Sequence, residues 1–116
     1  MRRLNSHLVG IDQGQIVLFE DFETDGPMWA GTGPRERRSR ITFSETYRNA
    51  PVVYASLSMW DMDQKHNMRA DIAAENIDET GFELVFRTWG DTRVARVRAG
   101  WLAIGELARS DEWDLY

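Results

Sequence analysis

The feature that most constrains this fold is an alternation of apolar and polar residues that recurs in several short segments. The clearest example is segment 52–60, in which one alternate set is expected to face a core: Val53, Ala55, Leu57 and Met59. Successive side chains of a β-strand point to opposite faces, so this period indicates strands. No segment keeps the period of an amphipathic helix, and an all-β fold is therefore predicted.

Six antiparallel strands packed as two sheets are what this pattern allows. We expect the strands at 15–19, 39–46, 52–60, 68–75, 82–87 and 95–104. The chain of 116 residues has no internal repeat and no linker, so one domain spanning 1–116 is expected. Segment 20–38 is predicted to be a loop, and its unusual length for a small β domain suggests function or subunit contact.

The composition excludes several classes of site and partner. The chain contains no cysteine, which rules out disulfides, thiolate metal sites and cysteine nucleophiles. Its net charge of -5 disfavours a general nucleic-acid binder. The run 35–40 is rich in arginine, and we interpret it as a solvated loop and strand face, with an anion-binding patch as the alternative.

Targeting signals are not expected in this sequence. The basic start Met1-Arg2-Arg3 is followed by polar residues before an apolar core of sufficient length develops, so no signal peptide is predicted. No stretch approaches the ~20 apolar residues of a membrane span. We therefore expect synthesis in the cytoplasm, no membrane insertion, and release from the cell or association with a particle.

Segment 88–94 has the chemistry of a sugar site. It reads Thr-Trp-Gly-Asp-Thr-Arg-Val and is predicted to be a polar turn between two strands, with Trp101 to Gly105 in the second. The Trp89 indole offers a flat apolar face to the C–H side of a pyranose ring, while carboxylate, guanidinium and backbone groups bind hydroxyls at the ring's edge. Asp91 either binds hydroxyls or caps the turn.

Further motifs follow in a fixed order at close spacing: Arg40 to Phe43, Pro51 to Val53, Asn67 to Arg69 and Asn76 to Phe82. Together with the segment around Trp89, they resemble the H-type lectin family over residues 14–105. The resemblance implies a six-stranded β-sandwich that forms trimers, some of them stacked as hexamers. It also implies a non-enzymatic glycan-binding protein of the cell-adhesion type, without cofactor or metal.

In this family the sugar lies at the boundary between two subunits. By resemblance, Arg69 and Trp89 with its successor Gly90 would come from one subunit. A carboxylate of the long loop would come from the next, and the candidates are Asp21, Glu23, Asp25 and Glu36. The chain departs from well-studied members at two positions, where Gly90 replaces a histidine and Ala95 a tyrosine. Galactose or N-acetylgalactosamine, or a related glycan, is the ligand class implied.

Two other classes of function stay open at this point. One is a structural or assembly module, for example of a phage-like particle, that has lost its sugar; the tail 110–116 would then be a docking segment or a frayed end. The other is a hydrolase or cation site using Asp61 and Asp63, although such residues at a strand end normally serve solubility. His7 and His66 lie in no metal or triad signature.

Overall fold

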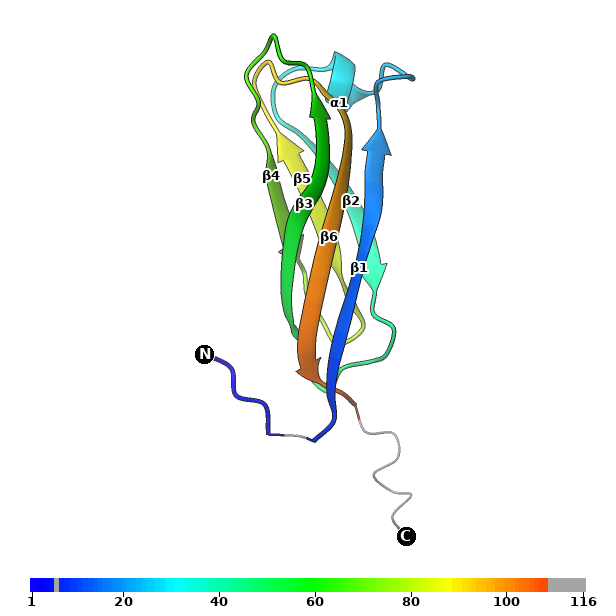
Figure 1. Cartoon of the computed structure of the whole chain (residues 1–116), viewed down its shortest axis with the longest axis vertical. Helices are drawn as coiled ribbons and strands as arrows, with labels where there is room; N and C mark the ends of the chain where they lie inside the picture. Colours follow the sequence, from blue (N-terminus) through cyan, green and yellow to red (C-terminus); the bar gives the residue numbers. More distant parts are fainter. Residues whose placement is uncertain (6, 109–116) are drawn as a thin grey trace.

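The structure of the protein, a computed structural model, describes residues 1–5 and 7–108 (Figure 1). Its elements are β1 (Val9–Glu20), α1 (Pro27–Ala30), β2 (Arg35–Thr42), β3 (Val52–Met62), β4 (Asp71–Glu75), β5 (Gly81–Thr88) and β6 (Val94–Glu106). The proposed docking tail 110–116 lies outside the described residues. Within those residues, no helix is long and apolar enough to span a membrane.

The six strands form two three-stranded sheets that lie face to face. One sheet has the order β1-β6-β3 and the other β2-β5-β4, and every pairing is antiparallel. Figure 1 shows the two layers, with the loop that carries α1 at one end and the chain termini at the other. The predicted six-stranded antiparallel β-sandwich is confirmed.

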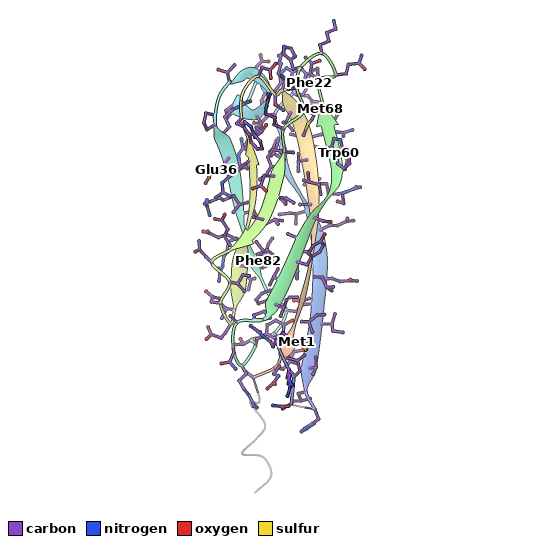
Figure 2. The ribbon with its side chains drawn as sticks, turned by 90° about the vertical axis from the view of Figure 1, so that its left-hand side faces the viewer. Met1, Phe22, Glu36, Trp60, Met68 and Phe82 are labelled. Carbon is purple, nitrogen blue, oxygen red and sulfur yellow. The ribbon has the colours of Figure 1, made fainter. Side chains whose placement is uncertain are left out.

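The core fills the space between the sheets, as the alternation predicted. Phe82, Leu84 and Phe86 of β5 are fully buried, and Figure 2 shows Phe82 between the sheets. They face the small side chains of β6, including Ala99 and Ala103, with which Phe82 and Leu84 share a cluster. Small residues on β6 leave room for the rings of β5, so the two sheets pack closely.

The structure corrects the predicted start of the first strand, which lies at Val9 rather than residue 15. In its first half the apolar side chains point outward, since Val9 and Ile11 are 41% and 69% exposed. Glycines take the inward positions: a Cβ on Gly10 would lie 2.5 Å from Leu107, and one on Gly14 would lie 2.9 Å from Trp101. A half-buried strand is predicted from apolar residues at its inward positions. This segment has glycines there instead, so its first half was missed.

The predicted loop 20–38 is also too long, because β2 begins at Arg35. The Arg35 and Arg37 side chains point inward, toward the connecting loop. Oxygen atoms of the protein accept their hydrogen bonds, so the strand can begin with two inward-facing cations. Arg37 pairs with the buried Asp21 at 3.0 Å. The predicted fourth strand is shortened to Asp71–Glu75, for a reason that lies in the candidate site.

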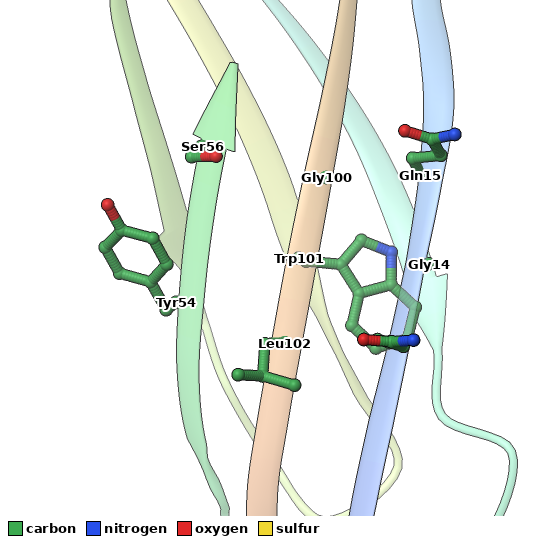
Figure 3. Close-up of a pocket in the computed structure, with 8 residues that line it drawn as sticks. Gly14, Gln15, Tyr54, Ser56, Gly100, Trp101 and Leu102 are labelled. Carbon is green, nitrogen blue, oxygen red and sulfur yellow. The ribbon is translucent and has the colours of Figure 1, made fainter. Parts of the chain in front are cut away.

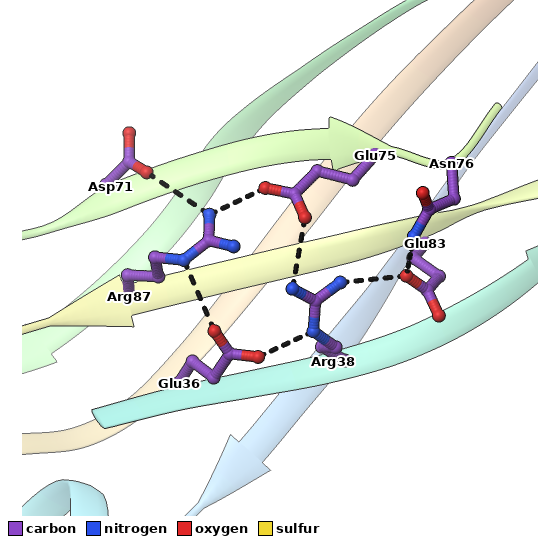
Figure 4. Close-up of polar contacts among 7 residues, drawn as sticks. All are labelled: Glu36, Arg38, Asp71, Glu75, Asn76, Glu83 and Arg87. Atoms are coloured by element: carbon purple, nitrogen blue, oxygen red, sulfur yellow. Dashed lines mark hydrogen bonds and ion pairs between the residues drawn. The ribbon is translucent and has the colours of Figure 1, made fainter. Parts of the chain in front are cut away.

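The outer face of the β2-β5-β4 sheet carries a continuous network of ion pairs (Figure 4). Arg38 binds Glu36, Glu75 and Glu83, while Arg87 binds Glu36, Glu75 and Asp71. Hydrogen bonds, first that from Arg87, hold the pKa of Glu75 below its usual range against the opposing effect of desolvation. The outward-facing Val85 is fully buried in the middle of this sheet.

The contacts of Arg35, Arg37, Arg38 and Arg40 decide between the two interpretations of the arginine run. Each of its arginines has a protein partner: Arg35 binds backbone carbonyls, Arg37 binds Asp21, Arg38 binds three glutamates and Arg40 binds Asp78. The run is a strand whose cations are compensated, which removes the argument for an anion-binding patch.

Candidate functional site

The end of the sandwich opposite the termini is built from three segments: the β5–β6 turn, the 63–70 segment before β4, and the 21–34 loop. The turn reverses at Gly90, whose φ of +70° lies in the left-handed region that glycine adopts without steric cost. This places Trp89 and Asp91 on either side of the reversal.

Two buried threonines fix the backbone around Arg69. The Thr92 hydroxyl donates to the Asn67 carbonyl at 2.6 Å and accepts from the Arg69 N–H at 3.1 Å. The Thr88 hydroxyl donates to the Arg69 carbonyl at 2.6 Å. These bonds replace strand pairing at residues 67–69, and this is why β4 begins only at Asp71. The prediction that Arg69 lies on the fourth strand is therefore wrong; it lies on the segment leading into β4.

Asp91 orients the Arg69 guanidinium. Arg69 Nη1 lies 3.0 Å from Asp91 Oδ1, and the Asn67 side-chain amide donates to the same oxygen at 3.3 Å. Desolvation acts to raise the pKa of the Asp91 carboxyl, but hydrogen bonds, first that from Asn67, and the charge of Arg69 hold it below its usual range. Asp91 thus ties the turn to the 63–70 segment through its side chain.

Gly90 also lies close to the Arg69 side chain. A Cβ placed there would lie 3.1 Å from Arg69 Nη1, so the guanidinium would have to shift by a few tenths of an ångström. The departure at Gly90 is therefore coupled to the position of Arg69. The remaining donors of Arg69 stay accessible, since its side chain is 37% exposed.

Trp89 lies at the end of β5 with 43% of its surface exposed. It lines a shallow groove of about 280 Å³ together with Pro34, Arg35, Glu36, Arg87 and Thr88. An exposed indole in a groove with charged neighbours offers both an apolar surface for stacking and groups that bind hydroxyls. The groove and the Arg69–Asp91 pair flank the same turn.

Arg35 attaches the 21–34 loop to this turn. Its guanidinium donates to the carbonyls of Gly33 and Thr92, both at 2.8 Å, and to those of Met28 at 3.1 Å and Gly90 at 3.3 Å. The Gly33 N–H adds a bond of 2.8 Å to the Gly90 carbonyl. The planar fork of arginine can satisfy this many acceptors at once, which lysine cannot.

Trp29 pins the same loop. Its ring lies 4.3 Å below the Arg93 guanidinium and 4.9 Å from the Phe22 ring, and its carbonyl accepts from Arg93 Nε at 3.0 Å. The buried Asp21 accepts from the Met28 N–H at 3.0 Å and so holds the start of α1. These contacts connect the loop to the sandwich.

Of the predicted site residues, the structure brings Arg69, Gly90 and Asp91 together, with Trp89 next to them in the chain. Asp25 lies on the 21–34 loop and, within the described residues, forms no hydrogen bond or ion pair with any of them. The sequence interpretation missed the positioning roles of Thr88, Thr92 and Arg35. A threonine on each side of Trp-Gly-Asp was the available signal.

Asp61 and Asp63 do not converge as a catalytic or metal pair. Asp61 pairs with Arg96 at 3.4 Å, whereas Asp63 accepts from the Lys65 N–H at 2.8 Å and lies 2.9 Å from His66 Nδ1. Backbone hydrogen bonding from Lys65, followed by His66, holds the pKa of Asp63 below its usual range against desolvation. Among the residues that the structure describes, no group of three acidic or histidine side chains could hold a metal ion.

Comparisons with known proteins bear on the family and the fold of the chain. A family model described as the H-type lectin domain matches residues 38–104. A protein of Fuscovulum blasticum named "ATP synthase subunits region ORF 7" is 55% identical over 107 residues, which cover 92% of this chain and 93% of that protein.

Two solved structures of discoidin II from Dictyostelium discoideum share the fold. Each has a TM-score of 0.74 and 23% identity; they cover 94% and 86% of this chain. The chain spans only 41% and 38% of those two discoidin II chains. The family match includes β3 to β5, most of β2 and β6, and with them Arg69, Trp89, Gly90 and Asp91. The chain belongs to the H-type lectin domain family.

Proposed function

We propose that this protein is a carbohydrate-binding module that acts multivalently, as a trimer or a hexamer, on surface glycans of the galactose or N-acetylgalactosamine type. The observation that carries the proposal is the exposed Trp89 indole beside a turn whose other side holds Arg69 in place through Asp91. The family and its fold are those of non-enzymatic lectins.

The chemistry of the two sides of the turn is complementary to a pyranose. The indole would stack on the C–H face of the ring, while the accessible donors of Arg69 would bind vicinal hydroxyls or an N-acetyl carbonyl. A carboxylate from the 21–34 loop of a neighbouring subunit, with Asp25 as the candidate, would complete the site. Such a shallow site binds weakly, and several linked sites would bind by avidity.

Self-association is supported by the outer face of the β1-β6-β3 sheet, which is apolar toward the chain termini. In the strand register, Ile11 and Val52 flank Ile104, and Gln13 and Tyr54 flank Leu102. Ile11, Val52 and Tyr54 are 69%, 51% and 69% exposed. A contiguous exposed apolar surface of this kind is typical of an interaction site.

Above this apolar surface the same face is hollowed at Gly100 (Figure 3). The hollow has a volume of about 490 Å³, and the residues around it include Gln15, Tyr54, Ser56 and Trp101. The outer face of the β2-β5-β4 sheet is covered by its ion-pair network, so we propose that the β1-β6-β3 face makes one subunit contact. The neighbouring loop that would reach Trp89 belongs to a second contact, at the end of the sandwich opposite the termini. Side chains from a second copy would fill the hollow.

A glycan array followed by calorimetry tests the sugar-binding proposal. We expect the wild-type protein to bind at least one galactose-type glycan and Trp89→Ala to lose that binding. Trp60→Ala is the matched control, since Trp60 is also exposed, at 58%, but lies on β3 (Figure 2). Equal binding by wild type and Trp89→Ala would contradict the proposal.

The apolar face also fits the second function considered from the sequence, an assembly module that has lost its sugar. The two functions differ in one outcome. A correctly folded oligomer that binds no glycan, and that is retained in a purified particle, would assign the chain to assembly instead.

A further inference from the structure

A second cleft, of about 380 Å³, opens beside the 21–34 loop at the end of the β1-β6-β3 sheet. Its lining consists of Glu20, Phe22, Glu23, Trp29, Asp61, Met62, Ala95 and Arg96. We propose that this cleft binds a primary ammonium group carried on a small hydroxylated skeleton, such as a sugar with a free amine.

The apolar part of the cleft is an aromatic corner. The rings of Phe22 and Trp29 lie 4.9 Å apart at 76°, and Phe22 is 56% exposed. Arg93 covers one face of the Trp29 indole at 4.3 Å and donates to the Trp29 carbonyl, which holds the indole in place. The exposed Phe22 ring is therefore the main aromatic surface left for a ligand. Aromatic surfaces of this kind attract both C–H groups and ammonium groups.

The polar part of the cleft is acidic. Three carboxylates, those of Glu20, Glu23 and Asp61, stand against the single guanidinium of Arg96, which is paired with Asp61 at 3.4 Å. Within the described residues, Glu20 and Glu23 have no side-chain partner, so their oxygens are available as acceptors. Carboxylates form charge-assisted hydrogen bonds with ammonium donors, and the Arg96–Asp61 pair can bind hydroxyls of the skeleton.

The surrounding charges also favour a cation. Arg93 lies 4.0 Å from Asp63 and Arg37 lies 3.0 Å from Asp21, so the nearby cations are compensated by carboxylates of their own. The whole chain carries a net charge of -5, which attracts cations in general rather than repelling them.

The cleft is separate from the site proposed for galactose-type glycans. None of Arg69, Trp89, Gly90 and Asp91 lines it. It is also at the opposite end of the sheet from the apolar surface around Ile11 and Val52, so subunit contact through that surface leaves room for a ligand. The inference therefore stands independently of sugar binding at Trp89.

Binding of an ammonium group in this cleft is tested by an NMR titration of the full chain. The ligands are D-glucosamine, N-acetyl-D-glucosamine and D-glucose, which share one ring and differ in the group at C2. We expect saturable shifts at the Trp29 indole N–H and at the Phe22 and Ala95 amides with glucosamine only. The double variant Glu20→Gln/Glu23→Gln should weaken this binding about tenfold or more, as expected for lost hydrogen bonds to a charged group.

Three controls test whether the observed shifts come from binding at this cleft. Glu45→Gln/Glu79→Gln makes the same change in net charge at exposed carboxylates elsewhere and should bind glucosamine as wild type does. Trp89→Ala should also leave this binding unchanged. Ethanolamine distinguishes the source of the ammonium: matching shifts assign recognition to the amine alone, whereas glucosamine-only shifts include the hydroxylated ring.

The inference is overturned by any of four results. These are no saturable shift with glucosamine, equal shifts with N-acetylglucosamine or glucose, undiminished binding by Glu20→Gln/Glu23→Gln, and loss of the binding in Trp89→Ala. The last result would assign the amine to the galactose-type site.

Discussion

Thr92 is the residue on which the geometry around Arg69 depends most. It is fully buried, and its hydroxyl serves one backbone acceptor and one backbone donor of the 67–69 segment. Thr92→Val keeps the shape but leaves those groups without a partner, at a cost of about 1–3 kcal/mol. We expect urea denaturation to show this loss in unfolding free energy and calorimetry to show weaker glycan binding.

The control for this prediction is Thr42→Val, which removes a hydroxyl from an exposed position on β2. It should change neither quantity. A Thr92→Val protein with wild-type stability would contradict the role assigned to Thr92.

Asp78 makes the stability of the turn before β5 sensitive to acid. Its carboxylate accepts first from the Thr80 N–H at 2.9 Å, then from the Thr80 hydroxyl, the Gly81 N–H and Arg40, and its pKa is lowered to about 2. A carboxyl whose folded-state pKa is depressed stabilises the fold above its unfolded-state pKa of about 3.9 and loses that contribution as pH falls through the folded value.

The wild-type protein should therefore lose unfolding free energy relative to Asp78→Asn as pH is lowered from about 4 to about 2. Urea denaturation at a series of pH values measures this difference, with Glu79→Gln, an exposed carboxylate of the same turn, as the control. If the difference in unfolding free energy between wild type and Asp78→Asn does not change with pH, Asp78 is not the source of the acid sensitivity.

At the scale of elements, the 21–34 loop and the β5–β6 turn form one unit through Arg35. Arg35→Lys keeps the charge but loses the fork that reaches carbonyls in both segments, and each lost bond to a charged donor costs about 1.5–3 kcal/mol. We expect faster hydrogen exchange at Gly31 and Gly33 and a lower unfolding free energy. Arg40→Lys, at an exposed ion pair on the same strand, should leave exchange in the loop unchanged.

Exchange in the loop that is equally slow in Arg35→Lys and wild type would show that other contacts hold it. The bonds of Asp21 and Trp29 would then be sufficient.

The elements that the sequence predicted best are those with an apolar face toward the core. β3, β5 and β6 follow this pattern, and their inward faces are as expected. β1 was predicted to start six residues too late because its apolar side chains face outward where Gly10 and Gly14 face inward. The period-two rule assumes that the apolar side of a strand is the buried side.

The candidate site was predictable in part. Trp89, Gly90 and Asp91 are contiguous in the chain, so their proximity follows from the sequence. The link to Arg69 depends on the Thr88 and Thr92 hydroxyls, and that to Arg35 on backbone carbonyls from two loops. The threonines on either side of Trp-Gly-Asp were a signal of such contacts. Residue types do not identify the partners, however, because the contacts form only when the segments meet in space.

At the scale of the whole molecule, the two faces of the sandwich have opposite properties. One is closed by ion pairs over Val85, and the other exposes Ile11, Val52 and Tyr54. Ile11→Lys places a charge in the apolar surface, and we expect it to convert the trimer or hexamer to monomers in analytical ultracentrifugation while the far-UV circular dichroism stays unchanged.

Thr42→Lys introduces the same charge on the outer face of the other sheet and should remain oligomeric. A wild-type protein that sediments as a monomer, or dissociation by Thr42→Lys but not Ile11→Lys, would contradict the assignment of the contact face.

A crystal of the oligomer soaked with N-acetylgalactosamine tests the central claim most directly. We predict electron density for one pyranose ring on the Trp89 indole, with a hydroxyl or the N-acetyl carbonyl within hydrogen-bond distance of Arg69, at the boundary with a second subunit. Trp89 buried in a subunit contact, or sugar bound only at a site away from Trp89 and Arg69, would contradict the account.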